Sequence, residues 1–166
     1  MDFKDLDLNK SILKAIAEEN YKAPTPIQEK VIPLVLEDKD VIASAQTGTG
    51  KTAAFALPIL HLLFDNKDGV KRARRIRAIV ISPTRELALQ IEQNFKTYSR
   101  YTSLKTAVVF GGTSIEPQKD KLRKGVDVLI ATPGRLLDLY KQELVHLDNV
   151  ETLVLDEADL MLDMGF

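Results

Sequence analysis

The sequence predicts an α/β fold, a mostly parallel β-sheet with helices on both faces. Five short, nearly continuous apolar runs mark the expected strands: Val41–Ala45, Ala78–Ile81, Ala107–Phe110, Val126–Ala131 and Thr152–Leu155. Runs that are apolar throughout, rather than at alternate positions, are typical of strands buried on both faces. Helical patterns lie between most of these runs, as in open sheets that bind ligands at the carboxyl ends of their strands.

Two helices are expected before the first strand. Residues 9–20 form an amphipathic pattern with four apolar side chains on one side. The second helix is expected to begin at Thr25-Pro26. Threonine suits the N-cap and proline the first helical position, and Gln28 at the third position completes a capping box.

Three further helices are expected between the later strands. They cover residues 51–64, 85–97 and 133–141. In the second of them, apolar side chains recur every four residues, which places them on one face of the helix.

Composition excludes several classes of protein. The 166 residues are 45% hydrophobic, and their net charge is -1. This overall charge does not indicate a nucleic-acid-binding protein, although a local basic patch can still bind RNA. The absence of cysteine excludes disulfides and thiolate metal sites. No apolar run approaches about 20 residues, and the acidic residues 1–5 do not fit a signal peptide. We therefore expect a cytoplasmic protein without a membrane segment.

The segment from Asp65 to Arg77 is polar and holds a run of basic residues at Lys71, Arg72, Arg74, Arg75 and Arg77. A solvated surface turn and an RNA-contacting loop both fit such a charge run, and the turn is the favoured interpretation. His61 and His146 are far apart and show no ligand-like spacing, so both are expected to be structural.

The strongest chemical motif is the run Ala45-Gln46-Thr47-Gly48-Thr49-Gly50-Lys51-Thr52, directly after an expected strand. Glycines let backbone N–H groups crowd around phosphate oxygens, and the following helix directs its unpaired N–H groups at the same anion. In such a phosphate loop, Lys51 neutralises the β- and γ-phosphates and the Thr52 hydroxyl ligates Mg²⁺. The general pattern has glycine where Ala45 stands, and an ordinary glycine-rich turn is the alternative.

A second motif, Asp156-Glu157-Ala158-Asp159, follows the last expected strand. In a parallel sheet, the end of this strand faces the same edge as the phosphate loop. Asp156 is then placed to hold Mg²⁺, and Glu157 to orient and deprotonate an attacking water. An acidic helix start is the alternative. With the phosphate loop upstream, phosphoryl transfer is favoured, and Lys51, Asp156 and Glu157 are the expected catalytic residues.

Taken together, these motifs resemble the first, N-terminal RecA-like domain of the DEAD-box RNA helicases. Residues 156–159 spell the family's name motif, and residues 45–52 match its phosphate loop, which commonly begins with alanine. Its RNA-facing motifs follow in order as Pro83-Thr84-Arg85-Glu86-Leu87, Gly111-Gly112 and Thr132-Pro133-Gly134-Arg135. Pro24-Thr25-Pro26-Ile27-Gln28 is similar to its adenine-reading Q motif. The resemblance covers essentially the whole chain and implies a RecA-like P-loop NTPase domain.

The resemblance implies an ATP site that extends beyond the phosphate loop. Gln28 is expected to read adenine, because its amide has donor and acceptor groups, which favours ATP over GTP. Phe3 stands where the family keeps an upstream aromatic that stacks on the base, and Tyr21 and Thr25 belong to the same nucleotide site. The capping box remains the alternative role for Gln28.

On the RNA side, the resemblance assigns contacts to Pro83, Thr84, Arg85, Gly111, Gly112, Thr132, Pro133, Gly134 and Arg135. Hydroxyls, backbone amides and guanidinium groups after strand ends can hold a ribose–phosphate track without reading bases. Contacts to 2′-hydroxyls would separate RNA from DNA. A helix cap at Thr132-Pro133 and a turn at Gly111-Gly112 are the structural alternatives.

The resemblance also implies a domain organisation. Residues 1–166 are expected to form the N-terminal RecA-like ATP-binding domain, with residues 1–30 as the Q-motif region and residues 41–166 as the P-loop core. Family members continue into a strand bearing Ser-Ala-Thr and a second RecA-like helicase domain, both absent from this sequence. Because arginines of that lobe stabilise transition-state charge, the fragment alone is expected to be nearly inactive. The lost strand is also expected to leave a sheet edge uncovered and to favour self-association.

The parent protein is therefore expected to be an ATP-dependent RNA helicase, an ATP hydrolase that acts on RNA and separates short duplexes, with ATP and Mg²⁺ as cofactors. An RNA-clamping scaffold with the same motifs is an open alternative. A P-loop NTPase that acts on DNA or a small molecule is disfavoured by the motifs around Gln28 and Thr132–Arg135.

Overall fold

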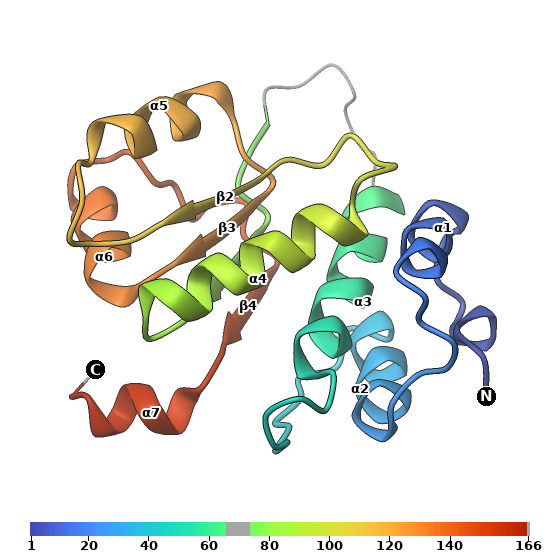
Figure 1. The fold of residues 1–166 in the computed structure, drawn as a ribbon. Helices are drawn as coiled ribbons and strands as arrows, with labels where there is room; N and C mark the ends of the chain where they lie inside the picture. The colour runs from blue at the N-terminus through green and yellow to red at the C-terminus, as the bar shows by residue number, and fades with distance from the viewer. Residues whose placement is uncertain (66–73, 166) are drawn as a thin grey trace. The chain divides into compact units, whose positions relative to one another are not determined.

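The computed structural model describes residues 1–65 and 74–165 of the chain. Its sheet has four strands: β1 (Ala78–Ile81), β2 (Thr106–Val109), β3 (Val128–Ala131) and β4 (Thr152–Leu155). They lie in the order β2-β3-β1-β4, and every neighbouring pair is parallel (Figure 1). The predicted parallel α/β fold is confirmed, and β1 and β4 have the predicted bounds.

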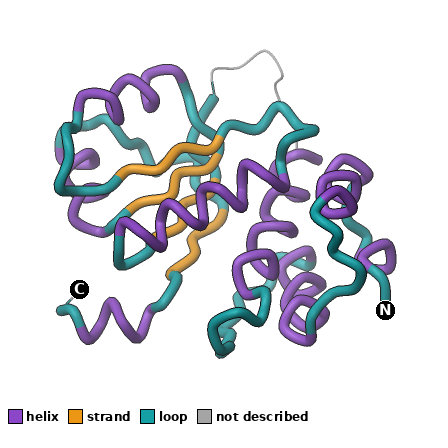
Figure 2. The backbone as a smooth tube through the Cα atoms, in the orientation of Figure 1, coloured by secondary structure: helices purple, strands orange, loops and turns teal. Residues whose placement is uncertain are grey.

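The helices in chain order are η1 (Phe3–Leu6), α1 (Lys10–Glu18), α2 (Pro26–Leu36), α3 (Lys51–Asp65), α4 (Arg85–Tyr98), α5 (Glu116–Lys124), α6 (Pro133–Lys141) and α7 (Ala158–Asp163) (Figure 2). Four of them, α1, α3, α4 and α6, match the expected helices within two residues at each end, and α2 begins where it was expected. The sequence pattern missed η1 and α5. Charged residues dominate α5, and Leu122 is its one large apolar side chain, so its apolar periodicity is weak.

The described chain divides into two compact units. The first holds residues 1–65 and 94–103, and the second holds residues 74–93 and 104–165. The sheet, the first part of α4, and α5 to α7 belong to the second unit. The remaining helices and the end of α4 belong to the first.

In the second unit, the core covers one face of the sheet. Alternate strand residues such as Ile79, Ala107 and Leu129 form this face, and Leu139 of α6 and Leu122 of α5 pack against it. Figure 1 shows α5 and α6 on this side and the first part of α4 on the opposite side. Apart from Thr106 and Ile81, the residues of β1, β2 and β3 are apolar and buried on both faces, which is why their apolar runs are continuous.

In the first unit, α2 and α3 pack together over fully buried residues that include Ile32, Leu57 and Leu60. The Asn9 N–H donates to His61 Nδ1 at 3.0 Å, which fits the expected structural role of His61. The Tyr98 hydroxyl lies 3.0 Å from that of Tyr21. Burial, followed by this hydrogen bond, raises the pKa of Tyr98 well above its usual range.

The predicted strand at Val41–Ala45 is wrong. This segment has irregular backbone and pairs with no strand among the described residues, and Ile42 is fully exposed. An apolar run becomes a strand only when a neighbouring strand accepts its backbone hydrogen bonds and helices cover its faces. Neither condition is met for these residues, although their composition is that of a buried strand.

The strand β4 leaves part of the apolar face of the sheet uncovered. Its Leu153 and Leu155 lie level with Ile79 and Ile81 of β1 and are 58% and 54% exposed. The opposite edge strand, β2, is different, because Ala107, Val108 and Val109 are all buried. The apolar surface of the sheet therefore continues onto β4 without a cover.

Part of the predicted basic loop, including Lys71 and Arg72, lies outside the described residues. Arg74 Nη1 pairs with the buried Asp127 Oδ2 at 2.6 Å, and Arg77 Nη2 lies 3.3 Å from Glu151 Oε2. These two cations are thus engaged within the chain, which supports a structural role for them. None of the described helices is both long and apolar enough to cross a membrane.

Candidate functional site

The carboxyl ends of all four strands lie at one edge of the sheet. The register places Val109, Ala131, Ile81 and Leu155 side by side as the last residues of their strands. The residues that follow are therefore level with one another. They begin the segments at Phe110, Thr132, Ser82 and Asp156, so the predicted RNA motifs share an edge with the acidic motif. We call this the carboxyl edge.

Asp156 and Glu157 follow β4 at the carboxyl edge. The Asp156 N–H donates to the Ile81 carbonyl at 2.9 Å, which extends the β1–β4 pairing by one residue and fixes a side chain that is only 6% exposed. Glu157 has φ 52° and ψ 48° and is the N-cap of α7. A left-handed conformation is costly for glutamate, and such strain is concentrated at functional sites. The two adjacent carboxylates thus differ in burial and backbone geometry.

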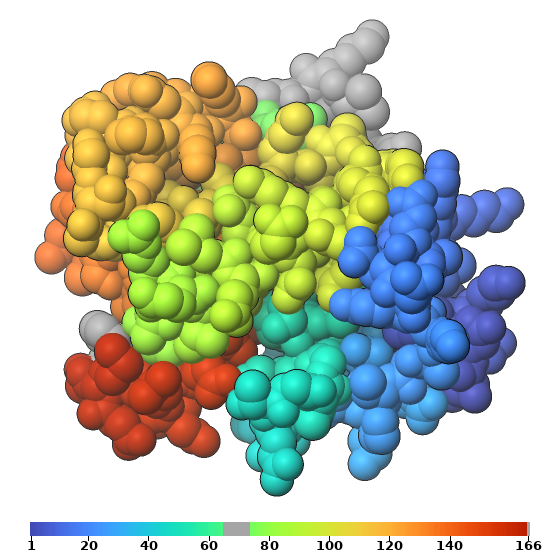
Figure 3. Space-filling model, in the orientation of Figure 1, coloured from blue at the N-terminus to red at the C-terminus, as the bar shows by residue number. Residues whose placement is uncertain are grey.

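The predicted RNA-contacting residues differ in exposure. Arg85, Gly111, Gly112 and Gly134 are exposed at the carboxyl edge, whereas Pro83 is buried. In the space-filling view, the first turn of α4 and the outer side of α5 lie at the surface (Figure 3).

Two threonines at this edge serve as helix caps. Thr84 Oγ1 accepts a hydrogen bond from the Leu87 N–H at 3.2 Å. Thr132 is the N-cap of α6, followed by Pro133, but its side chain makes no capping hydrogen bond. The expected cap at Thr132-Pro133 is confirmed for the backbone, and the hydroxyl of Thr132 is not used for it.

At two glycines of the carboxyl edge, neither steric contact nor backbone conformation requires glycine. A Cβ added to Gly111 or Gly134 would meet no atom within 4 Å, and neither residue has a positive φ. Gly112 differs, since its φ of +78° favours glycine. Close approach of a ligand to the backbone is the remaining common use of glycine.

Arg135 is bonded inside the second unit. Its Nη1 donates to Gln118 Oε1 and its Nη2 to the Thr113 carbonyl, each at 3.0 Å. Its side chain is only 11% exposed. The sequence motif gave no sign of these partners, because Gln118 and Thr113 belong to no recognised motif of the chain.

The phosphate loop lies in the first unit. Gly48 and Gly50 have φ values of +84° and +81°, and the 15-residue helix α3 begins at Lys51. The Thr49 hydroxyl donates to the Gln46 carbonyl at 2.6 Å, and Gln46, Thr47 and Gly48 are exposed. A left-handed glycine turn at the start of a long helix is the geometry that presents backbone N–H groups to a phosphate.

Gln28 joins the helix α2 to the phosphate loop. Its Oε1 accepts from the Thr25 N–H at 3.0 Å, which is the hydrogen bond expected from the capping box. Its Nε2 donates to the Gly50 carbonyl at 3.1 Å. The residue is 4% exposed, and its amide retains one lone pair and one N–H for a further partner.

Phe3 is buried rather than presented to a ligand. It is 4% exposed, and its ring stacks on that of Tyr21 with 6.3 Å between centroids. Tyr21 itself is 40% exposed. Stacking of a nucleotide base on Phe3 stays a prediction, and it would require the ring to leave this site.

Lys51 belongs to the first unit, whereas Asp156 and Glu157 belong to the second. Their convergence around one triphosphate therefore stays a prediction. No three His, Asp or Glu side chains of the described residues form a metal site.

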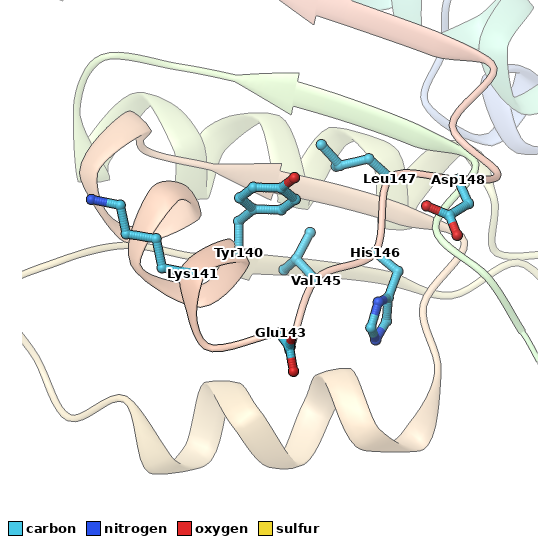
Figure 4. Close-up of a pocket in the computed structure, with 7 residues that line it drawn as sticks. All are labelled: Tyr140, Lys141, Glu143, Val145, His146, Leu147 and Asp148. Carbon is cyan, nitrogen blue, oxygen red and sulfur yellow. The ribbon is translucent and has the colours of Figure 1, made fainter.

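A shallow hollow lies at the C-terminal end of α6. Its lining consists of Tyr140, Lys141, Glu143, Val145, His146, Leu147 and Asp148 (Figure 4). None of the predicted site residues lines this hollow, because the predicted site residues of α6 lie in the first turn of the helix. His146 lines this hollow, and its expected structural role stays a prediction.

Replacing Gly50 with Ala is expected to destabilise the first unit more than replacing Gly48. Both changes place a side chain at positive φ, which costs about 1–2 kcal/mol. At Gly50 the added Cβ would also overlap Gln28 Nε2, whereas at Gly48 it meets nothing within 4 Å. Loss of the Gln28–Gly50 hydrogen bond adds about 0.5–1.5 kcal/mol. Urea unfolding of both variants measures the difference, and equal losses would show that Gln28 does not brace the loop.

Comparison with known proteins gives one consistent result. The family model for the DEAD/DEAH box helicase matches residues 25–166. The chain is 51% identical over 164 residues to the DEAD-box ATP-dependent RNA helicase RhpA of Helicobacter pylori, covering 99% of the chain and 32% of that protein. It is 49% identical over 166 residues to the ATP-dependent RNA helicase CshA of Limosilactobacillus reuteri, covering 100% of the chain and 32% of that protein.

Two solved structures are also similar. The DEAD box protein from the hyperthermophile Methanococcus jannaschii superposes with a TM-score of 0.90 at 42% identity, covering 99% of the chain and 44% of that protein. A hypothetical ATP-dependent RNA helicase from Sulfolobus tokodaii gives a TM-score of 0.85 at 41% identity, covering 96% and 44%. The chain thus spans about a third of the length of the curated relatives it matches.

Proposed function

Because the chain belongs to the DEAD/DEAH box helicase family, we propose that it is the ATP-binding and RNA-contacting lobe of an ATP-dependent RNA helicase. The observation that carries the proposal is the common carboxyl edge, which brings Arg85, Gly111, Thr132 and Asp156 to the ends of neighbouring strands. Ligands of open α/β sheets bind at such an edge. The proposed organisation is one N-terminal RecA-like domain over residues 1–166, with residues 1–30 as its Q-motif region and residues 41–166 as its P-loop core.

In the proposed ATP site, residues 45–52 surround the triphosphate. Backbone N–H groups around Gly48 and Gly50 and the start of α3 bind phosphate oxygens, and Lys51 neutralises their charge. Gln28 uses its remaining donor and acceptor on adenine while its other two groups stay bonded to Thr25 and Gly50. Binding of adenine at Gln28 would thus be coupled to the phosphate loop through the hydrogen bond to Gly50.

The proposed chemistry is hydrolysis of the terminal phosphoanhydride of ATP. Thr52 and Asp156 are the residues that would hold Mg²⁺, which supplies charge neutralisation on the phosphates when bound. Glu157 accepts the proton of the attacking water. Its half-buried, left-handed position fixes the carboxylate relative to the end of β4.

For RNA, we propose a ribose–phosphate track along the carboxyl edge. Exposed Arg85 supplies a cation, and the backbones of Gly111 and Gly134 are open to close approach. Contacts of this kind fix a strand without reading its bases. Most of the proposed helicase lies outside this chain, and a second lobe is needed to close on ATP and RNA together.

Nucleotide and strand competition tests this function. In the full-length protein, ATP is expected to displace a fluorescent ATP analogue and GTP is not, because Gln28 pairs with the adenine edge. Single-stranded RNA is expected to stimulate hydrolysis, and DNA of the same sequence is not, because it lacks the 2′-hydroxyl. Stimulation by DNA alone would contradict the proposal. The chain contains no cysteine, which suits a reducing compartment, and we assign its action to the cytoplasm.

The isolated 166-residue chain is expected to self-associate through β4. Its exposed Leu153 and Leu155 and its free strand edge can both pair with a second copy. Sedimentation velocity at rising concentration should show dimers or larger species that the Leu153→Lys, Leu155→Lys double variant lacks. Leu137→Lys is the control, since Leu137 on α6 is equally exposed but lies outside the sheet. A concentration-independent monomer would contradict this expectation.

A further inference from the structure

Gln118 is a buried polar residue that none of the motifs explains. It is the third residue of α5, and it is 6% exposed, although α5 is otherwise largely charged and solvated. Burial of an amide is costly unless its groups are hydrogen-bonded. The hydrogen bonds of Gln118 must therefore offset the cost of burying its amide.

The first two bonds of Gln118 hold the end of β2. Its Oε1 accepts from the Phe110 N–H at 3.3 Å, and its Nε2 donates to the Phe110 carbonyl at 3.1 Å. Phe110 directly follows β2, where the ladder to β3 ends with the bond from Thr132 N–H to the Val109 carbonyl at 3.1 Å. The side-chain amide thus replaces a neighbouring strand for one residue, and it fixes the direction in which Gly111-Gly112 leaves the sheet.

The third bond of Gln118 reaches the start of α6. Arg135 Nη1 donates to the same Oε1 at 3.0 Å, so this oxygen uses both of its lone pairs. Arg135 Nη2 donates to the Thr113 carbonyl at 3.0 Å, which bonds the other end of the glycine loop. The loop 111–113 is therefore held by Gln118 at Phe110, the residue before it, and by Arg135 at Thr113, its last residue.

The side chain of Phe110 contacts the start of α4. The Arg85 guanidinium carbon lies 4.7 Å from the centroid of the Phe110 ring, a cation–π contact. Since β3 lies between β1 and β2, this contact crosses the carboxyl edge over β3. The starts of α4 and α6 and the loop after β2 are linked in this way through Phe110 and Gln118.

We propose that Gln118 is the positioning residue of the RNA track, which holds the Gly111-Gly112 loop and Arg135 in one fixed arrangement. The inference rests on the proposed function and specifies how that site is built. Gln118 does not touch RNA in this scheme. It prevents the loop from taking other conformations, and the exposed glycine backbones then need no ordering when RNA binds.

The test uses the full-length protein and a fluorescent single-stranded RNA in the presence of a non-hydrolysable ATP analogue. Gln118→Met keeps the side-chain length and removes all three hydrogen bonds. We expect it to weaken RNA binding about tenfold, as for one lost charge-assisted hydrogen bond. The RNA concentration for half-maximal ATPase should rise similarly, while the rate at saturating RNA and the affinity for the analogue alone stay unchanged. Gln142→Met, which removes the exposed bond to Asp138, is the matched control.

A double-mutant cycle with Arg135→Ala separates positioning from general stability. If Gln118 acts through the loop and Arg135, Gln118→Met should weaken RNA binding less in the Arg135→Ala background than in the wild type, because the bond between the two side chains is already lost. Additive losses would overturn the inference. Gln118→Glu is the second variant if Gln118→Met does not fold: it retains acceptors for Phe110 N–H and Arg135 but loses the donor to the Phe110 carbonyl. We expect it to bind RNA with an affinity between those of Gln118→Met and the wild type.

The outcomes for the inference and for the proposed function differ. If the wild type binds RNA, Arg85→Ala weakens it and both Gln118 variants bind as the wild type does, the inference fails and the proposed function stands. If the wild type does not bind RNA with the analogue present, both are overturned.

Discussion

The 166-residue chain alone is expected to hydrolyse ATP about 10³–10⁵-fold more slowly than the full-length protein at saturating RNA. Arginines that reach the transferred phosphoryl group from a second lobe supply this factor in related phosphoryl-transfer enzymes. The chain covers only 32% of the relative RhpA, which leaves ample length for such a lobe. Phosphate release from both proteins, measured side by side with and without RNA, gives the ratio directly.

Two controls make this comparison decisive. Lys51→Ala in the full-length protein gives the background rate when the proposed phosphate-binding ammonium is absent. Binding of a fluorescent ATP analogue to the 166-residue chain shows that the nucleotide site itself is formed. Rapid RNA-stimulated turnover by the chain alone would refute the need for a second lobe.

Replacing Glu157 with Gln in the full-length protein is expected to lower RNA-stimulated ATP hydrolysis by about 10²–10⁴-fold, the usual contribution of a general base. Glutamine has the same shape but does not accept the proton of the water. Binding of the ATP analogue should be retained, because Glu157 has no proposed part in holding the nucleotide. Single-turnover hydrolysis, measured after mixing with excess enzyme, isolates the chemical step from product release.

Glu143→Gln is a matched control for this experiment. Glu143 also has a left-handed backbone, with φ 58°, but it lies in the turn after α6, away from the carboxyl edge. The same substitution there removes a charge from a similarly strained position and should leave the rate unchanged. An equal loss in both variants would mean that charge or backbone strain, rather than proton transfer, explains the effect of Glu157.

Much of the fold followed from local patterns. The strands β1 and β4 and the helix α6 have their predicted bounds, because continuous apolar runs and the Thr132-Pro133 cap are strong local signals. The same logic failed at Val41–Ala45, which has the composition of a strand but no strand beside it. It also missed α5, whose charged sequence forms a helix because Ile115 and Leu122 pack on the sheet.

The site was predicted less completely. The phosphate loop and the acidic motif could be identified from the sequence, because the residues of each motif are contiguous. The register places the ends of β1, β2, β3 and β4, and the motifs that follow them, at one edge. The meeting of the acidic motif with the phosphate loop at that edge stays a prediction, because the two motifs belong to different units. Nothing in the sequence indicated that Phe3 is buried against Tyr21 or that Arg135 is bonded to Gln118.

By itself, the sequence determined which chemical groups this protein carries and the order in which they follow the strands. The tertiary structure decided which of those groups are already engaged and which surfaces stay uncovered. Gln28 bonds to Gly50 and Gln118 to Phe110 and Arg135, while Leu153 of β4 is left exposed. The reason is physical: hydrogen bonds and burial join residues that are distant along the chain, and their partners are fixed only when the helices and strands pack.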